Sequence, residues 1–184
     1  MLRQPVLILL SAALLLWTLA SPAAAQEPRV TKYASMIRAE PGLVAYWPFD
    51  GDLTDTQGRA PGKGGPPGVR FVAGPADGNA VLLEKGGFVT MGPCPHLDLP
   101  QTTIELIFQL TAPPTGQYDP TLIAKRTGHL ETRFSFHVIK DMKRLALWNG
   151  SQVVYFDPPG GPLAIGRWHH LAATWKPGDL RLYL

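Results

Sequence analysis

The sequence predicts an all-β fold in which two antiparallel sheets pack as a sandwich. Short apolar runs recur from residue 43 onward, and several of them alternate apolar and polar residues with a period of two. The 19 glycines and 19 prolines fall between these runs rather than in one block, as turns between short strands require. No long helical pattern interrupts the runs, which favours a sandwich over a mixed α/β architecture.

The first 25 residues are typical of a secretory signal peptide. Arg3 precedes an uncharged apolar run over residues 6–20, and Ala23 and Ala25 supply an A-x-A cleavage pattern. A membrane anchor is the alternative, but this run is shorter than the roughly 20 residues that span a bilayer. We therefore expect an exported protein, periplasmic, secreted or on the cell surface, with no membrane span after cleavage.

The mature chain divides into a lead-in segment and one domain. The lead-in covers residues 26–41 and contains a short predicted helix over residues 31–39, which Pro41-Gly42 ends. Residues 42–184 then form a single domain that is long enough to bury a core. The sequence contains no internal repeat that would indicate a second domain.

The expected strands follow one another along this domain. The first is residues 43–48, and residues 58–68 after it form a flexible loop rich in glycine and proline. The clearest is residues 102–110, where Ile104, Leu106, Phe108 and Leu110 share one face. Further strands are predicted at residues 69–73, 80–84, 87–92, 120–126, 133–140, 144–150, 153–157, 168–175 and 180–184, the last two joined by a turn at residues 177–179.

Three stretches carry a resemblance to a known family. They are GLVAYWPFDGDLTDTQG at residues 42–58, TTIELIFQL at residues 102–110 and GRWHHLAATWKPGDLRLYL at residues 166–184. In this order and spacing they resemble the laminin G-like, concanavalin A-like jelly-roll domains, whose fold is a two-sheet antiparallel jelly-roll sandwich. In such domains further strands follow the last hairpin. We therefore expect a jelly roll that is incomplete at its C-terminus, either truncated or degraded.

Asp50, Asp52 and Asp55 surround Gly51 and are the candidate metal ligands. Calcium takes six to eight oxygen ligands, and three carboxylates could supply part of that shell. The resemblance adds that many such jelly rolls bind calcium in loops at the rim of the sandwich. Asp and Gly are equally the ordinary residues of turns, in which the aspartate accepts hydrogen bonds from nearby N–H groups. Both interpretations, a calcium cofactor and a structural turn, stay open.

Trp148 and Asn149 are the candidate ligand-binding residues. Trp148 stands beside an Asn-Gly hairpin signal, where an aromatic ring can remain exposed and stack on a sugar or a protein surface. Trp47 and Trp175 are expected in the core. His169 and His170 are adjacent on a strand and point to opposite faces, so they cannot chelate one ion together.

The sequence lacks the patterns of several enzyme classes. Glu105 has no second carboxylate two positions away on its strand, whereas glycosidases on related jelly rolls use such a pair. Neither a G-x-S-x-G motif nor a phosphate-binding glycine loop occurs. Cys94 is the single cysteine and lies between prolines, which favours an unreactive thiol over a catalytic one.

These observations lead to a hypothesis for function. With 17 basic and 14 acidic residues and no basic run, the chain has no electrostatic case for nucleic acid. We expect an exported, non-catalytic binding or adhesion module that recognises a carbohydrate or a protein surface through its rim loops. One alternative is a glycan-cleaving hydrolase whose acids lie elsewhere. Another is a structural spacer within a larger surface protein.

Overall fold

The computed structural model describes residues 29–65, 67–75, 78–126, 132–150 and 152–184. The predicted signal peptide and its cleavage site lie outside these residues. Within them the structure consists of short strands in antiparallel sheets with one α-helix and one 3₁₀ turn, so the all-β prediction is confirmed. None of the described helices is long and apolar enough to cross a membrane.

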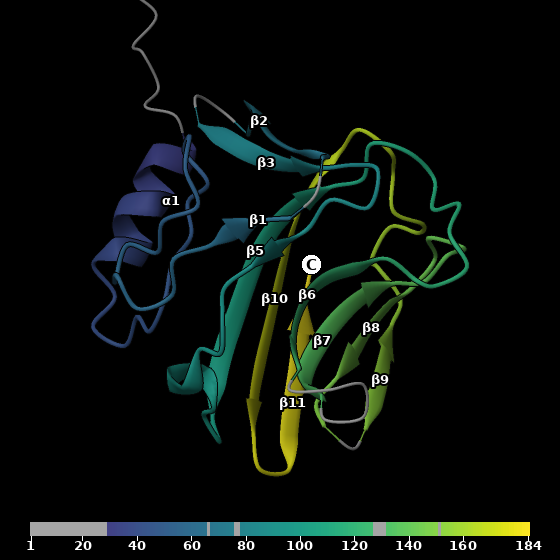
Figure 1. Ribbon diagram of the computed structural model, residues 1–184. Helices are drawn as coiled ribbons and strands as arrows, with labels where there is room; N and C mark the ends of the chain where they lie inside the picture. Colours follow the sequence, from purple (N-terminus) through teal and green to yellow (C-terminus); the bar gives the residue numbers. More distant parts are fainter. Residues whose placement is uncertain (1–28, 66, 76–77, 127–131, 151) are drawn as a thin grey trace, which may run out of the picture.

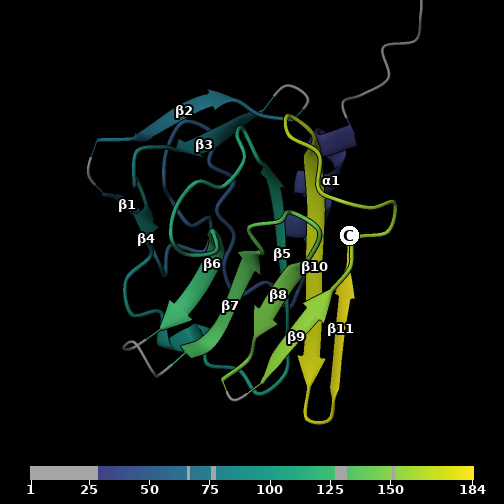
Figure 2. The same ribbon diagram turned by 90° about the vertical axis from the view of Figure 1, so that its right-hand side faces the viewer.

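Two sheets form the body of the domain. The first holds β5 (Thr102–Gln109), β10 (Trp168–Lys176) and β11 (Asp179–Tyr183), in the order β11-β10-β5. The second holds β6 (Thr121–Arg126), β7 (Thr132–Val138), β8 (Leu145–Trp148) and β9 (Val153–Phe156), in sequence order. Figure 1 shows the two sheets as facing layers, and Figure 2 presents β6–β9 in front of β5, β10 and β11.

The core lies between these layers because each strand turns its apolar side inward. On β7 the alternation places Phe134, Phe136 and Val138 in the core, while on β10 it places Leu171 and Ala173 there. Trp175 packs on Phe134 with ring centroids 5.8 Å apart, as expected for a core tryptophan. The other buried members of the cluster are Phe108, Leu145, Leu147 and Leu163.

Smaller elements cover the periphery. Helix α1 (Arg29–Arg38) lies on the side of β5 and β10 that faces away from the second sheet (Figures 1 and 2). Two short antiparallel pairs, β1 (Lys63–Gly64) with β4 (Val89–Thr90) and β2 (Val69–Ala73) with β3 (Asn79–Leu83), precede β5. The predicted lead-in helix is therefore confirmed, and it begins two residues earlier than expected.

The first predicted strand is wrong. Residues 43–48 form no strand, because their backbone bonds to the acidic turn that follows instead of to a neighbouring strand. The N–H of Tyr46 donates to the Asp55 side chain, and the Tyr46 carbonyl accepts from Thr56 at 2.9 Å. The predicted loop over residues 58–68 also contains β1, since the backbone at Lys63–Gly64 pairs with Val89–Thr90.

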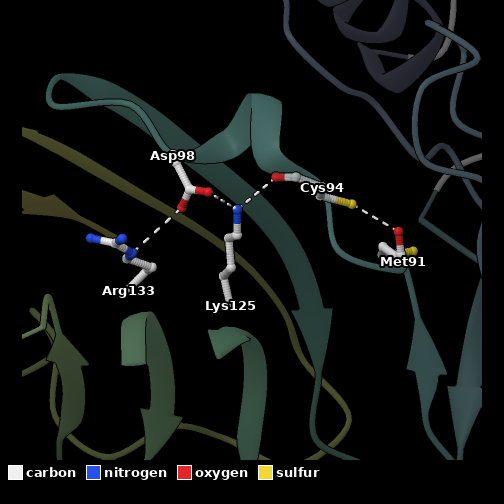
Figure 3. Close-up of polar contacts among 5 residues, drawn as sticks. All are labelled: Met91, Cys94, Asp98, Lys125 and Arg133. Atoms are coloured by element: carbon white, nitrogen blue, oxygen red, sulfur yellow. Dashed lines mark hydrogen bonds and ion pairs between the residues drawn. The ribbon is translucent and has the colours of Figure 1, made fainter. Parts of the chain in front are cut away.

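An inward-pointing lysine ties the end of β6 to the 3₁₀ turn η1 (Pro95–Leu97). The Lys125 ammonium donates to the Cys94 carbonyl at 2.6 Å and pairs with the Asp98 carboxylate at 2.7 Å, as Figure 3 shows. Cys94 and Asp98 flank the turn, so one cation holds both of its ends. The lysine is 8% exposed, and an ammonium buried to this degree needs such partners.

Candidate functional site

Asp55 organises the acidic turn. Its carboxylate is 1% exposed and accepts four backbone hydrogen bonds. Oδ1 accepts from the N–H groups of Tyr46 at 2.9 Å and Gln57 at 3.0 Å. Oδ2 accepts from Arg59 at 2.9 Å and Ala60 at 3.2 Å. Both oxygens are thus committed to folding the chain around the carboxylate.

The protonation of Asp55 follows from these contacts. Burial raises the pKa of a carboxyl group because it disfavours the charged form, but the four N–H donors stabilise the anion. Their combined effect exceeds that of burial, and the pKa of Asp55 lies below its ordinary value. Asp55 is therefore a charged structural residue at neutral pH.

Asp50 and Asp52 are placed differently from Asp55. Both are exposed; Asp50 accepts from the Asn79 amide at 3.0 Å, and Asp52 accepts from the Thr54 N–H at 2.8 Å in a local turn. No three His, Cys, Asp or Glu side chains among the described residues form a group that could hold a metal ion. Calcium binding stays a prediction, with Asp50 and Asp52 as its accessible carboxylates.

The outer side of the four-stranded sheet presents two exposed aromatic rings. Trp148 on β8 is 45% exposed and Tyr155 on β9 is 56% exposed. Register places Trp148 opposite Ser135 and Tyr155 opposite Ala146, so the small buried residues lie beside the large exposed ones. We call the surface formed by Trp148, Tyr155, Ser135, Ala146 and His137 the aromatic face. Asn149 follows Trp148 at the rim, where its N–H donates to the Gln152 carbonyl at 3.2 Å.

A polar network continues the aromatic face onto β6 and β7. His137 Nε2 lies 2.8 Å from the Ser135 hydroxyl, and Nδ1 lies 3.2 Å from the Thr121 hydroxyl. The Arg126 guanidinium is 3.5 Å from His137 Nε2. Burial lowers the pKa of His137, and the charge of Arg126 lowers it further, although Asp119 opposes the shift. The imidazole is therefore neutral at pH 7 and offers one donor and one acceptor.

The Ser135–His137 pair has part of the geometry of a nucleophile and its base. A serine nucleophile must reach its substrate, yet Ser135 is only 1% exposed. The second nitrogen of His137 contacts a threonine hydroxyl instead of an orienting carboxylate. This arrangement favours a fixed polar surface over a catalytic dyad.

The charged side chains on the strands of this sheet are all basic. Strands β6 to β9 contain no Asp or Glu, and they contain Lys125, Arg126 and Arg133. Just before β8, the Arg144 guanidinium lies over the Tyr155 ring, 5.0 Å from its centroid. Such stacking holds the tyrosine in place while one side of its ring stays accessible.

A second polar cluster lies on the outer side of the three-stranded sheet, and sequence reasoning missed it. The Tyr33 hydroxyl of α1 donates to the Glu105 carboxylate of β5. His170 Nε2 of β10 lies 3.3 Å from the Tyr33 oxygen and 3.5 Å from Glu105 Oε2. Glu105 lies 72 positions after Tyr33 in the sequence, and His170 lies 137 positions after it. No local sequence motif could therefore have shown that the three residues meet.

The remaining candidates behave as structural residues. His169 faces inward and stacks on Phe108 with ring centroids 5.4 Å apart, as its shared face with Leu171 predicted. Cys94 is buried, its thiol donates to the Met91 carbonyl at 2.8 Å (Figure 3), and burial raises its pKa. A protonated, buried thiol is a poor nucleophile, which agrees with the prediction of an unreactive cysteine.

Comparison with known proteins gives no assignment. Neither a family model, nor a curated protein, nor a solved structure matches the chain.

Proposed function

We propose that this protein is an exported, non-catalytic binding module that recognises a carbohydrate through the aromatic face and the adjoining rim at Asn149. The observation that carries the proposal is the exposure of Trp148 and Tyr155 on one side of a rigid sheet. Aromatic rings held on one side of a sheet offer a surface on which a partner can stack. Sugar rings present apolar C–H faces that stack on them.

The polar groups of the aromatic face fit the same class of ligand. A sugar needs donors and acceptors at its hydroxyl groups, and the same side of the sheet carries the neutral His137, with the Arg126 guanidinium 3.5 Å from its Nε2. Both groups are held by neighbours, so little side-chain entropy is lost when a ligand binds. A protein surface is the alternative ligand, since tyrosine, tryptophan and arginine also dominate protein interfaces.

A glycan-cleaving hydrolase remains the second candidate function. It would need two carboxylates flanking the ligand, typically about 5 to 10 Å apart. The strands beneath the aromatic face supply none, which supports binding without cleavage. A spacer role within a larger surface protein is compatible with the same fold, but it assigns no role to the exposed rings of Trp148 and Tyr155.

The family likeness, export and calcium belong to this proposal as well. Two facing antiparallel sheets support a laminin G-like jelly roll, although this architecture also occurs in unrelated folds. Export rests on residues 1–25 and is tested by sequencing the N-terminus of the secreted protein, which should begin at Gln26.

Calcium should raise the melting temperature relative to a chelator, and the Asp50→Asn/Asp52→Asn double variant should abolish the rise. If wild type melts at the same temperature with calcium and with the chelator, calcium is no part of the proposed function.

The test of function is a glycan-array screen of the purified protein, followed by titration of the strongest ligand. We expect Trp148→Ala and Tyr155→Ala each to weaken binding by about tenfold; stacking on an aromatic side chain contributes on the order of 1–3 kcal/mol for a nucleobase, and we expect a similar contribution for a sugar. Tyr118→Ala is the matched control, because Tyr118 is 79% exposed but lies outside the aromatic face. An unchanged affinity in Trp148→Ala, or no glycan bound at all, would refute the proposal.

A further inference from the structure

Three side chains with metal-binding donor atoms meet on the outer side of the three-stranded sheet. Tyr33 comes from helix α1, Glu105 from β5 and His170 from β10. Figure 1 shows the helix on the side of β5 and β10 that faces away from the second sheet. The rings of Tyr33 and His170 contact edge-to-face with centroids 5.5 Å apart. Three separate elements thus bring a phenol, a carboxylate and an imidazole together.

The spacing of the donor atoms suits a tetrahedral metal ion. His170 Nε2 lies 3.3 Å from the Tyr33 oxygen and 3.5 Å from Glu105 Oε2. Zinc bonds to nitrogen and oxygen are about 2.0–2.2 Å long, which places neighbouring donors of a tetrahedral shell about 3.3–3.5 Å apart. The Tyr33 hydroxyl donates a hydrogen bond to Glu105. An ion seated between the three donors would replace that hydrogen bond.

The charges of the cluster fit a divalent ion. Burial and the neighbouring Glu105 carboxylate raise the pKa of Tyr33, so its hydroxyl is protonated at neutral pH in the absence of metal. When an ion binds the phenol oxygen, the O–H bond breaks and the proton passes to water. The phenolate and the carboxylate then balance two positive charges. Because this proton is harder to lose than that of an ordinary tyrosine, Glu105 and His170 are the stronger ligands.

The cluster is open enough for an ion to enter and for water to complete its shell. The His170 side chain is 49% exposed and that of Glu105 is 36% exposed. Among the described residues Glu105 has no lysine or arginine partner, so a metal ion displaces no such cation. Imidazole suits zinc, copper, iron and nickel, whereas calcium and magnesium prefer oxygen ligands. The donor set therefore favours a transition metal.

We propose that Tyr33, Glu105 and His170 bind one divalent transition-metal ion, with Zn²⁺ as the reference ion. Water fills the remaining position of the tetrahedral shell. Because Tyr33 belongs to α1, the bound ion also links the helix to the sheet. The site lies on the other sheet from the aromatic face, so it does not depend on sugar binding there. It also differs from the acidic turn, where the accessible donors are carboxylates alone.

Isothermal titration of the tag-free purified protein with Zn²⁺ tests the site. We expect one ion per chain, and Ca²⁺ or Mg²⁺ at equal concentration should not displace it. His170→Gln and Glu105→Gln should each lower the affinity by at least about tenfold, since even outer-shell partners of metal ligands contribute about 10–100-fold. Tyr33→Phe keeps the ring, removes only the oxygen and should lower the affinity less. His137→Ala is the matched control and should bind Zn²⁺ as wild type does.

Two results would overturn the site. One is a wild-type protein that binds no Zn²⁺, and the other is an affinity that survives both His170→Gln and Glu105→Gln. Near-UV circular dichroism shows whether each variant keeps its fold. If a variant does not fold, electron paramagnetic resonance of wild type with one equivalent of Cu²⁺ decides. Hyperfine splitting from one imidazole nitrogen is expected, and a spectrum without nitrogen splitting rejects the proposal.

Discussion

The Asp55 carboxylate accepts a hydrogen bond at 2.9 Å from the backbone N–H of Tyr46, nine residues earlier in the chain. Through this contact one side chain substitutes for the neighbouring strand that residues 43–48 lack. Three further N–H groups converge on the same carboxylate. One anion therefore satisfies four backbone N–H groups of the turn.

Asp55→Asn should destabilise the protein by about 2–4 kcal/mol, because the amide keeps one acceptor oxygen and points N–H donors at backbone donors. The measurement is chemical unfolding of wild type and variant. Asp52→Asn is the matched control, since Asp52 is exposed and accepts a single local bond. A variant at Asp55 as stable as the one at Asp52 would contradict this role.

The lowered pKa of Asp55 should make the stability of the protein depend on pH in a specific way. The folded-state pKa of Asp55 is depressed, so its stabilisation is fully present above the unfolded-state value of about 3.9 and is lost as pH falls through the lower folded value. The stability gap between wild type and Asp55→Asn should therefore be constant near neutral pH and shrink in acid below about pH 4. A gap in stability that widens in acid would contradict a lowered pKa of Asp55 in the folded protein.

The Lys125–Asp98 ion pair should respond unequally to loss of either partner. Lys125→Met removes the buried charge and leaves Asp98 exposed to water and within 3.6 Å of Arg133, so we expect a change of about 1 kcal/mol or less. Asp98→Asn leaves the buried ammonium without its counter-charge and should lower the melting temperature more. Thermal melts at neutral pH compare the two, and the reverse order would contradict the assignment of Lys125 as the costly partner.

Trp148 and Phe136 provide a paired test of the assigned faces. Trp148→Ala should change the free energy of unfolding by about 1 kcal/mol or less, because much of the ring is already exposed. Phe136→Ala should cost about 3–5 kcal/mol, because its side chain is fully buried between the sheets. Urea unfolding distinguishes them, and a strongly destabilised Trp148→Ala would mean that the ring supports the fold.

Alternation along the strands made much of the fold predictable. The pattern around residues 102–110 and in β7 gave the correct inward faces, since a half-buried strand separates its residues by side. The pattern failed at residues 43–48, because an apolar run shows burial but not which groups satisfy its backbone. Pairing with Asp55 is a tertiary event that periodicity does not encode.

Candidate site residues could be predicted where neighbouring residues in the sequence determine their environment. Trp148 was recognised from its hairpin signal and is exposed as expected. Ser135 and His137 could have been found, because they alternate with phenylalanines on one strand and must share its outer face. Tyr155 and the Tyr33–Glu105–His170 cluster could not, since their environments depend on strand register and on a helix that is far away in the sequence.

The strand order has a consequence for how the chain acquires its structure. Strands β6 to β9 pair only with their neighbours in sequence, so this meander can form as soon as it leaves the ribosome. Strand β5 precedes them in the sequence but pairs with β10, which is synthesised only after all four strands of the meander. Until then the backbone edge of β5 that pairs with β10 is unpaired, and an unpaired strand edge is open to misassembly.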